Sequence, residues 1–437
     1  MSMERELRVL LLVAEPLRAD DGGGNTAINF FDGMDAEFAQ IYCSDLMPKN
    51  SFCTRYYQIS EQERIKNFFS HKKVGHVLTE APQEKQASNV AAPIGRSLFR
   101  AIKTLRWEIF ITARHLLAMA SNWKTEDLKQ FIVTFDPDVV YAPCYASPFL
   151  LALTRYVKEL TGKKVLTWSA DDNYSLRQFS LSPFYWLNRF WVRSCLRKTY
   201  PYYDSFYSIS EDEIEEMTPV VGKEMKILRK GIHTEEIAPL KETVNTPIRM
   251  VYAGGIYIQR WKTLQAIGEV LRKINDKDVK IVLDIYTQNQ LTSQQEKALN
   301  DGRSIFTHPA VNLEQLKEIY HDSDIAIHCE SFALKNRLTT RLSFSTKIID
   351  CLASGCAVLA VAWEEQTGLK YLKSQDAAIC VTDLKQLETE IRSLVSEPER
   401  ILAYAEKARV CGLKNHDIRK IQDELYSELK RLSQECQ

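Results

Sequence analysis

The chain has 437 residues, of which 45% are apolar and 26% charged, a balance typical of soluble globular proteins with two or three domains. Lysine plus arginine and aspartate plus glutamate both number 57, so no overall positive field favours nucleic acid. The 10 cysteines include no C-x-x-C pair, which argues against zinc and favours a reducing cytoplasm. Every apolar run is short, so we expect neither a signal peptide nor a membrane span.

The first half of the chain alternates predicted strands and helices. A buried strand at 8–15 is followed by a loop rich in aspartate and glycine, a second strand and a long helical region. Further strands are predicted at 136–143, 163–172 and 203–210, with helices over 148–162 and 183–199. This alternation predicts an α/β domain over 1–235.

A second alternating series follows the polar, proline-containing residues 236–247, which we expect to be a linker. The series begins with a strand at 249–255, ends with a strand at 357–363, and predicts a domain over 248–415 and a closing helix over 416–437. The fold class is therefore α/β, with two Rossmann-like doubly wound domains facing an interdomain cleft.

One segment of the second series, RLSFSTKIIDCLASGCAVLAVAW (341–363), predicts a short helix with a polar start. Ser345 is a suitable N-cap and Gly355 a suitable left-handed C-terminal cap. Ser345, Thr346 and Lys347 gather where free backbone N–H groups attract anions, and Asp350 lies one turn further on. A ligand with a phosphate and a diol, such as a nucleotide, would suit both features. A capped helix with a solvated lysine explains the pattern equally well.

Three motifs carry a resemblance to a known family: VYAGGIYIQRWKTL, NLEQLKEIYHDSDIAIHCES and SFSTKIIDCLASGCAVLAV. Together they resemble GT-B glycosyltransferases, particularly the family 4-like enzymes of bacterial surface-polysaccharide assembly. The resemblance implies that the second domain binds a nucleotide-sugar donor and the first presents a glycan or lipid-linked acceptor. It also implies retention of anomeric configuration, work at a membrane and no metal or other cofactor.

The resemblance assigns further roles in the second domain. Gly255 allows close approach of the donor, and Arg260 and Lys262 meet the charge that develops on the departing diphosphate. Glu330 orients the sugar, and Asp350 replaces the family's second glutamate at the ribose. The alternatives are an exposed basic pair at a helix start and a Glu330 carboxylate paired with a nearby base, Lys335 or Arg337.

The first domain offers fewer candidates. Gly23 and Gly24, in a glycine run, could approach the donor, and Asp171 and Asp172 follow a strand on the acceptor side or merely cap the next helix. The run Gly22–Ala27 also matches a dinucleotide fingerprint, but about seven residues separate it from the preceding strand. The D-x-D sequence at 322–324 precedes a buried strand and is interpreted as a turn, not a metal site.

Two segments favour an anionic membrane surface as a partner. Residues 94–124 contain six basic residues and one acid, and residues 184–203 contain four basic residues, no acid and many aromatics. Ordinary packed helices with exposed bases are the alternative. No known nucleic-acid-binding motif accompanies either segment.

We therefore predict a cytoplasmic enzyme, peripheral on the inner face of the membrane, that uses a nucleotide sugar without a metal. Three alternatives remain open: a sugar-nucleotide epimerase with the same fold, an NAD(P)-dependent oxidoreductase and a non-catalytic scaffold.

Overall fold

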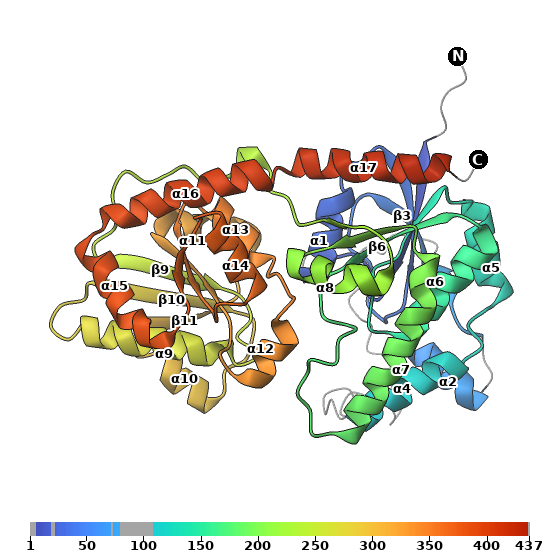
Figure 1. Ribbon diagram of the computed structural model, residues 1–437, viewed down its shortest axis with the longest axis horizontal. Coiled ribbons are helices and arrows are strands. Elements are labelled where there is room, and N and C mark those ends of the chain that lie inside the picture. The colour runs from blue at the N-terminus through green and yellow to red at the C-terminus, as the bar shows by residue number, and fades with distance from the viewer. Residues whose placement is uncertain (1–5, 19–21, 71–72, 79–107, 436–437) are drawn as a thin grey trace, which may run out of the picture. The chain divides into compact units, whose positions relative to one another are not determined.

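The computed structural model describes residues 6–18, 22–70, 73–78 and 108–435, and the chain divides into two compact units (Figure 1). Unit 1 contains the residues up to Leu228 together with those from Gln422 onward, and unit 2 runs from Arg229 to Ile421. The expected linker 236–247 is not free of the second unit. Its Ala238 N–H donates to the Ala353 carbonyl at 3.0 Å, and Asn245 donates to the Asp324 carboxylate. These contacts place residues 236–247 in unit 2, so the boundary between the two units lies nearer the N-terminus than the sequence predicted.

The sheet of unit 1 has eight strands among the described residues, in the order β4-β3-β2-β1-β5-β6-β7-β8. All neighbours are parallel except β3 and β4, which are antiparallel. The strands are β1 Leu7–Val13, β2 Ala36–Tyr42, β3 Cys53–Gln58, β4 His76–Leu78, β5 Val139–Tyr141, β6 Lys164–Ser169, β7 Ser205–Ser208 and β8 Met225–Ile227. The long helical region expected before residue 136 is wrong in part, because it contains strand β3 and the edge strand β4.

Helices cover this sheet and bury one apolar core with it. They are α1 Gly22–Phe31, α2 Glu61–Ser70, α4 Glu108–Ala120, α5 Glu126–Phe135, α6 Pro148–Thr161, α7 Pro183–Thr199, the 3-10 helix η1 Tyr200–Tyr202 and α8 Glu211–Val221. Helix α6 begins at an N-capping Ser147 followed by Pro148 and ends at Gly162, which is left-handed, as the capping rules predict.

Unit 2 contains a six-stranded sheet in the order β11-β10-β9-β12-β13-β14, in which all neighbours are parallel. The strands are β9 Ile248–Ala253, β10 Ile281–Thr287, β11 Ile305–Pro309, β12 Ile325–Cys329, β13 Ala357–Val361 and β14 Ile379–Val381. This is the strand order of a Rossmann fold, with a switch point between β9 and β12.

Helices lie on both faces of this second sheet, with α9 and α10 on one side and α11 and α13 on the other (Figure 1). The helices are η2 Thr234–Glu236, α9 Arg260–Ile274, α10 Ser293–Leu299, α11 Leu313–Asp322, α12 Leu334–Thr340, α13 Lys347–Ala353, α14 Thr367–Ser374, η3 Leu384–Gln386, α15 Leu387–Ser396 and α16 Glu399–Asn415. A separate apolar core fills this unit. The prediction of two doubly wound α/β domains is confirmed.

The last helix, α17 (Ile418–Gln434), begins in unit 2 and belongs to unit 1 from Gln422 onward. Its buried Glu428 accepts hydrogen bonds from Ser205 and Lys226 of unit 1. Among the described residues, no helix is both long and apolar enough to cross a bilayer.

Candidate functional site

The predicted donor residues lie where β9 and β12, the two strands at the switch point of unit 2, reach their carboxyl ends. Gly254 and Gly255 follow β9, and Glu330 follows β12. In open α/β sheets a ligand binds at this position, because the helices on either side of the switch point diverge from it. The structure therefore brings three predicted residues, Arg260, Glu330 and Lys347, to one end of one sheet.

Arg260 and Glu330 form a buried ion pair. The guanidinium Nε and Nη2 donate to the two carboxylate oxygens at 2.9 and 2.7 Å, and the two residues are 9% and 2% exposed. Burial disfavours the charged form of Arg260, but the Glu330 carboxylate outweighs burial and raises the pKa of the guanidinium. The alternative that Glu330 pairs with a base is thus correct, but the base is Arg260 and not Lys335 or Arg337.

Lys347 is the second cation of this cluster. A Cβ placed on Gly254, whose φ is +152°, would lie 1.9 Å from the Lys347 Nζ, so the lysine crosses the backbone at the end of β9. Its Nζ also lies 5.4 Å from the ring centroid of Tyr252. Burial lowers the pKa of Lys347, and the charge of Arg260 lowers it further. Among the described residues, no carboxylate forms an ion pair with Lys347.

The start of helix α13 differs from the prediction. Thr346, and not Ser345, occupies the N-cap position, and its side chain makes no capping hydrogen bond. The Ser345 and Thr346 carbonyls instead accept from the Ile348 and Ile349 N–H groups. Helix α13 is only seven residues long, so its dipole contributes little. Lys347 therefore supplies most of the positive charge at this end of the helix.

Asp350 and Lys262 lie outside the Arg260–Glu330–Lys347 cluster. The Asp350 carboxylate accepts a hydrogen bond from Lys230 Nζ at 2.7 Å and is 40% exposed, so its predicted ribose contact would have to compete with this ion pair. Lys262 is exposed on α9, with its Nζ 5.8 Å from the Trp261 ring. The two bases of the RWK sequence are therefore not equivalent, because only Arg260 turns into the unit.

The loop between β9 and α9 is strained and held in place. Ile258 and Gln259 have φ values of 55° and 59°, a left-handed conformation that is unusual for a β-branched residue. Asn336 of α12 donates to the Ile258 carbonyl at 2.8 Å, and Asn289 accepts from the Ile256 N–H at 2.8 Å. The sequence analysis missed both asparagines, which carry no motif.

His328 of β12 was also missed. It is 3% exposed, burial lowers the pKa of its imidazole to about 4, and its Nε2 has no hydrogen-bond partner among the described residues. Its imidazole is therefore neutral at physiological pH. The apolar strand context of DIAIHC gave no signal for it beyond an isolated polar residue.

The predicted residues of unit 1 are engaged in internal packing. Gly23 lies within α1, and a Cβ on Gly24 would lie 2.5 Å from the Arg18 carbonyl oxygen, so the chain's own loop requires glycine at 24. Eight residues lie between the end of β1 at Val13 and the start of α1 at Gly22. In a dinucleotide site, by contrast, the glycine turn follows the strand directly.

Asp172 is likewise used within unit 1, as the center of a hydrogen-bonded turn. Its buried carboxylate accepts from Arg189 Nη2 at 2.9 Å, from the Ser175 N–H at 2.8 Å and from Gln178 Nε2 at 3.2 Å. Asp171, beside it, is exposed. The alternative that these aspartates cap the next helix is wrong, because Ser182 caps helix α7.

A buried carboxylic acid, Glu213 of α8, lies at the ends of β6 and β7. Ser169 and Ser208 donate to its two oxygens at 2.5 and 2.6 Å. Burial, outweighing these two hydrogen bonds, raises the pKa of Glu213 to about 7. The sequence analysis missed it, because EDEIEEM contains five acidic residues and gives no sign of which one turns inward.

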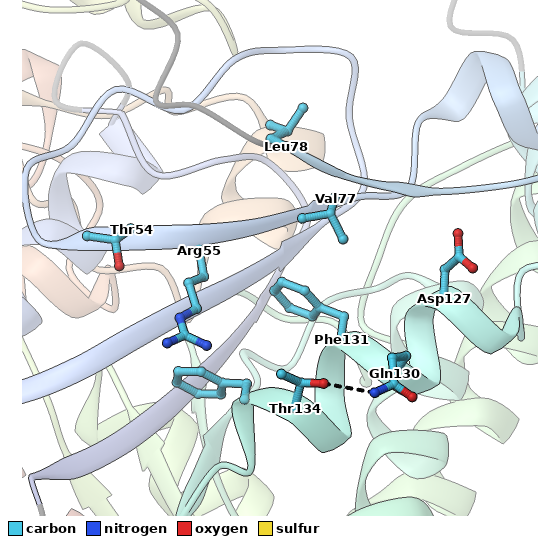
Figure 2. A pocket seen from close by; sticks show the side chains of 9 residues that line it. Thr54, Arg55, Val77, Leu78, Asp127, Gln130, Phe131 and Thr134 are labelled. Carbon is cyan, nitrogen blue, oxygen red and sulfur yellow. Dashed lines mark hydrogen bonds between the residues drawn. The ribbon is translucent and has the colours of Figure 1, made fainter.

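Unit 1 also has a pocket of about 510 Å³ between the edge strands β3 and β4 and helix α5. Figure 2 shows Phe131 lying between Arg55 and Asp127, with Gln130 donating to Thr134 at 3.1 Å. None of the site residues predicted from sequence lines it. No three His, Cys, Asp or Glu side chains gather as a metal site would require, within the described part of the chain.

Comparisons with known proteins agree with this architecture. Residues 268–427 match the family model described as glycosyl transferase-like. Among curated protein sequences, none matches the chain.

Several solved structures have a similar fold. An E. coli trehalose-6-phosphate structure bound with UDP-2-fluoro glucose is 11% identical, with a TM-score of 0.62 over 97% of this chain and 99% of that one. HepE of Anabaena, in complex with UDP and glucose, is 11% identical, with a TM-score of 0.60 over 98% and 100%. An α,α-trehalose-phosphate synthase (UDP-forming) from Burkholderia vietnamiensis is 12% identical, with a TM-score of 0.62 over 98% and 99%. The chain therefore has the GT-B fold, and its residues 268–427 match a glycosyl transferase-like family model.

Proposed function

We propose that the chain transfers a sugar from a nucleotide-sugar donor to a glycan or lipid-linked acceptor. The observation that carries the proposal is Lys347, a partly buried cation that lies against Gly254 at the switch point of unit 2 and forms no ion pair with the described residues. Removing a cation from water without a partner costs free energy, and a bound anion would offset that cost. The similar structures that contain UDP and sugars support a nucleoside diphosphate as that anion.

The proposed chemistry follows from the charge balance of the cluster. Glu330 neutralises Arg260 and fixes the plane of its guanidinium through two hydrogen bonds, so Arg260 keeps a defined direction. Lys347 adds the net positive charge. When the sugar–phosphate bond breaks, negative charge grows on the departing diphosphate, and preorganised cations stabilise it without reorganisation.

The remaining details are proposals on the same basis. We propose metal-independent transfer with retention of anomeric configuration, and polysaccharide assembly as its setting, from the motif resemblance. Asp350 is the proposed ribose ligand, in exchange for its contact with Lys230. Asp171 remains proposed for the acceptor side and Gly23 for the donor side, from the sequence alone.

A nucleotide screen followed by a transfer assay tests this function. We expect UDP, GDP or dTDP to raise the unfolding temperature of the chain, because a ligand that binds only the folded state stabilises it, whereas NAD(P) should not. The stabilising nucleotide sugar should then label a glycan acceptor, and EDTA should leave the rate unchanged.

Other outcomes would replace the proposal. Conversion of the donor sugar without any acceptor would indicate the epimerase. Stabilisation by NAD(P) alone would indicate an oxidoreductase, and the lack of any nucleotide effect would leave only a scaffold.

A further inference from the structure

Unit 1 exposes a group of large apolar side chains around the start of helix α7. These side chains, called here the α7 apolar surface, belong to the preceding loop and to the first half of the helix. They are Phe179 (48% exposed), Leu181 (89%), Phe184 (43%), Leu187 (61%) and Phe190 (53%). Single exposed apolar residues are common on soluble proteins, but five within twelve residues are not.

Local structure directs these side chains outward and holds them there. Helix α7 begins at the N-capping Ser182, and Phe184, Leu187 and Phe190 follow at intervals of three, on one face. The loop is fastened to the helix, since Trp186 Nε1 donates to the Ser180 carbonyl at 3.0 Å and Arg189 Nη2 donates to the Ser175 carbonyl at 2.7 Å. The exposure of Leu181 is therefore a feature of a fixed loop.

Helix α4 lies beside α7 and extends the same kind of surface (Figure 1). His115 of α4 bonds Asn188 of α7 at 3.0 Å. The apolar residues Ile109 and Leu116, one heptad apart on α4, are 45% and 56% exposed. Two adjacent helices of unit 1 thus both leave large apolar residues in water.

The segment that carries this surface is basic. Between Asp172 and Asp204 the sequence has five basic residues and no acidic residue. The Arg177 side chain is 72% exposed and lies 3.6 Å from the Glu216 carboxylate of α8, and Arg197 and Lys198 near the end of α7 are exposed as well. Apolar and aromatic side chains beside bases match a bilayer interface with anionic headgroups, which offers acyl chains and negative charge together.

We infer that the α7 apolar surface docks unit 1 on an anionic lipid bilayer, with Leu181 and Leu187 entering the headgroup region. This inference deepens the proposed function by naming the surface that would meet a membrane carrying a lipid-linked acceptor, and it requires none of the donor site. It also restricts the membrane contact that the sequence predicted for residues 184–203 to part of that segment. In α7 the exposed large apolar residues lie in the first half, whereas Val192 and Leu196 are buried. The bases Arg96, Arg100, Lys103 and Arg106 lie outside the described residues.

Sedimentation with lipid vesicles tests the inference. The full chain should bind vesicles of phosphatidylcholine with phosphatidylglycerol, bind phosphatidylcholine alone less, and dissociate as salt is added. The double variant Leu181→Asp/Leu187→Asp should lose about tenfold or more of its partitioning, because carboxylates oppose both insertion and the anionic surface. A matched variant, Val133→Asp/Val410→Asp, alters residues that are 53% and 50% exposed elsewhere and should bind like the parent.

Three results would overturn the inference: no binding by the parent, equal losses in both double variants, or a parent dimer that the Leu181/Leu187 change separates without any vesicle binding. UDP titration of the same proteins separates the two proposals. If the Leu181/Leu187 variant loses vesicle binding but keeps its affinity for UDP, the change affects only the membrane surface and not the donor site. Vesicle binding without any nucleotide binding would remove the donor site and leave the docking intact.

Discussion

The two units use charged residues at the carboxyl ends of their strands in different ways. In unit 1, Asp172 is saturated by Arg189 and the Ser175–Gln178 turn, and Gly24 is packed against Arg18. In unit 2, Arg260 and Glu330 neutralise each other, but Lys347 keeps a charge that no carboxylate of the described residues balances. The same residue types are therefore paired within unit 1, whereas in unit 2 one partly buried cation has no carboxylate partner among the described residues.

This contrast shows why residue type and strand position alone do not identify a site. A charged residue at a strand end becomes a functional candidate when no opposite charge of the protein pairs with it, because a bound ligand can then supply that opposite charge. Each prediction below alters one side of the comparison.

The largest effect is expected from Asp172→Ala in unit 1. Removing the carboxylate leaves Arg189 partly buried without its partner, which should cost about 3–5 kcal/mol of unfolding free energy. Denaturant unfolding measures the loss, and UDP affinity of the folded variant should be unchanged. Asp171→Ala, at the exposed neighbour, is the control and should cost less than about 1 kcal/mol. Equal losses would mean that the Asp172 turn is not a stabilising element.

A second effect in unit 1 should depend on pH through Glu213. Its folded-state pKa of about 7 lies above the ordinary 4.5, so stability is fully present below pH 4.5 and declines as pH rises to 7. Relative to Glu213→Gln, the parent should lose about 3 kcal/mol of unfolding free energy over this range. Urea unfolding at both ends of the range measures it, and parallel pH profiles of the two proteins would contradict the raised pKa.

In unit 2, Gly254→Ala should weaken UDP binding without removing any charge. The new Cβ would collide with the Lys347 ammonium, which must then move from the end of β9, and we expect about tenfold weaker binding. Gly302→Ala is a matched control, because Gly302 also has a positive φ but open space around it. Titration calorimetry should show a loss for the first variant only. An equal loss in both would point to general backbone strain.

The smallest effect should be a pH dependence of UDP affinity. Because burial and Arg260 lower the pKa of Lys347, its charge is lost at lower pH than that of an ordinary lysine. Affinity for UDP should therefore fall by less than about tenfold as pH rises toward 10.5, the ordinary pKa of a lysine. Lys347→Arg, which stays protonated over this range, should bind UDP with little change. A parent affinity that is flat over this range would contradict the lowered pKa.

Much of the architecture could be predicted from the sequence, because buried parallel strands read as apolar runs and helices as periodic ones. The stretches LRVLLLV and AVLAV became β1 and β13 within two residues of expectation. The strands β3 and β4 were missed, since CTRYYQ has no clear alternating period and HVL has only three residues.

The site could be predicted only in part. Motif spacing identified Arg260, Glu330 and Lys347, but their partners depend on contacts across 70 residues or more, such as Arg260 with Glu330 and Lys230 with Asp350. No local pattern shows which of Arg260 and Lys262 turns inward. Residues two apart on a helix point to nearly opposite sides, and packing against the neighbouring strand determines which side is buried.

Calorimetric titration of Lys347→Ala with UDP and with uridine tests the central claim most directly. If Lys347 binds the diphosphate, the variant should lose about 1.5–3 kcal/mol of UDP binding, tenfold or more, and bind uridine within about twofold of the parent. Lys262→Ala, which removes an exposed lysine nearby, should change neither affinity. A Lys347→Ala variant that binds UDP within about twofold of the parent would contradict the claim, and the switch point of unit 2 would then not be the anion site.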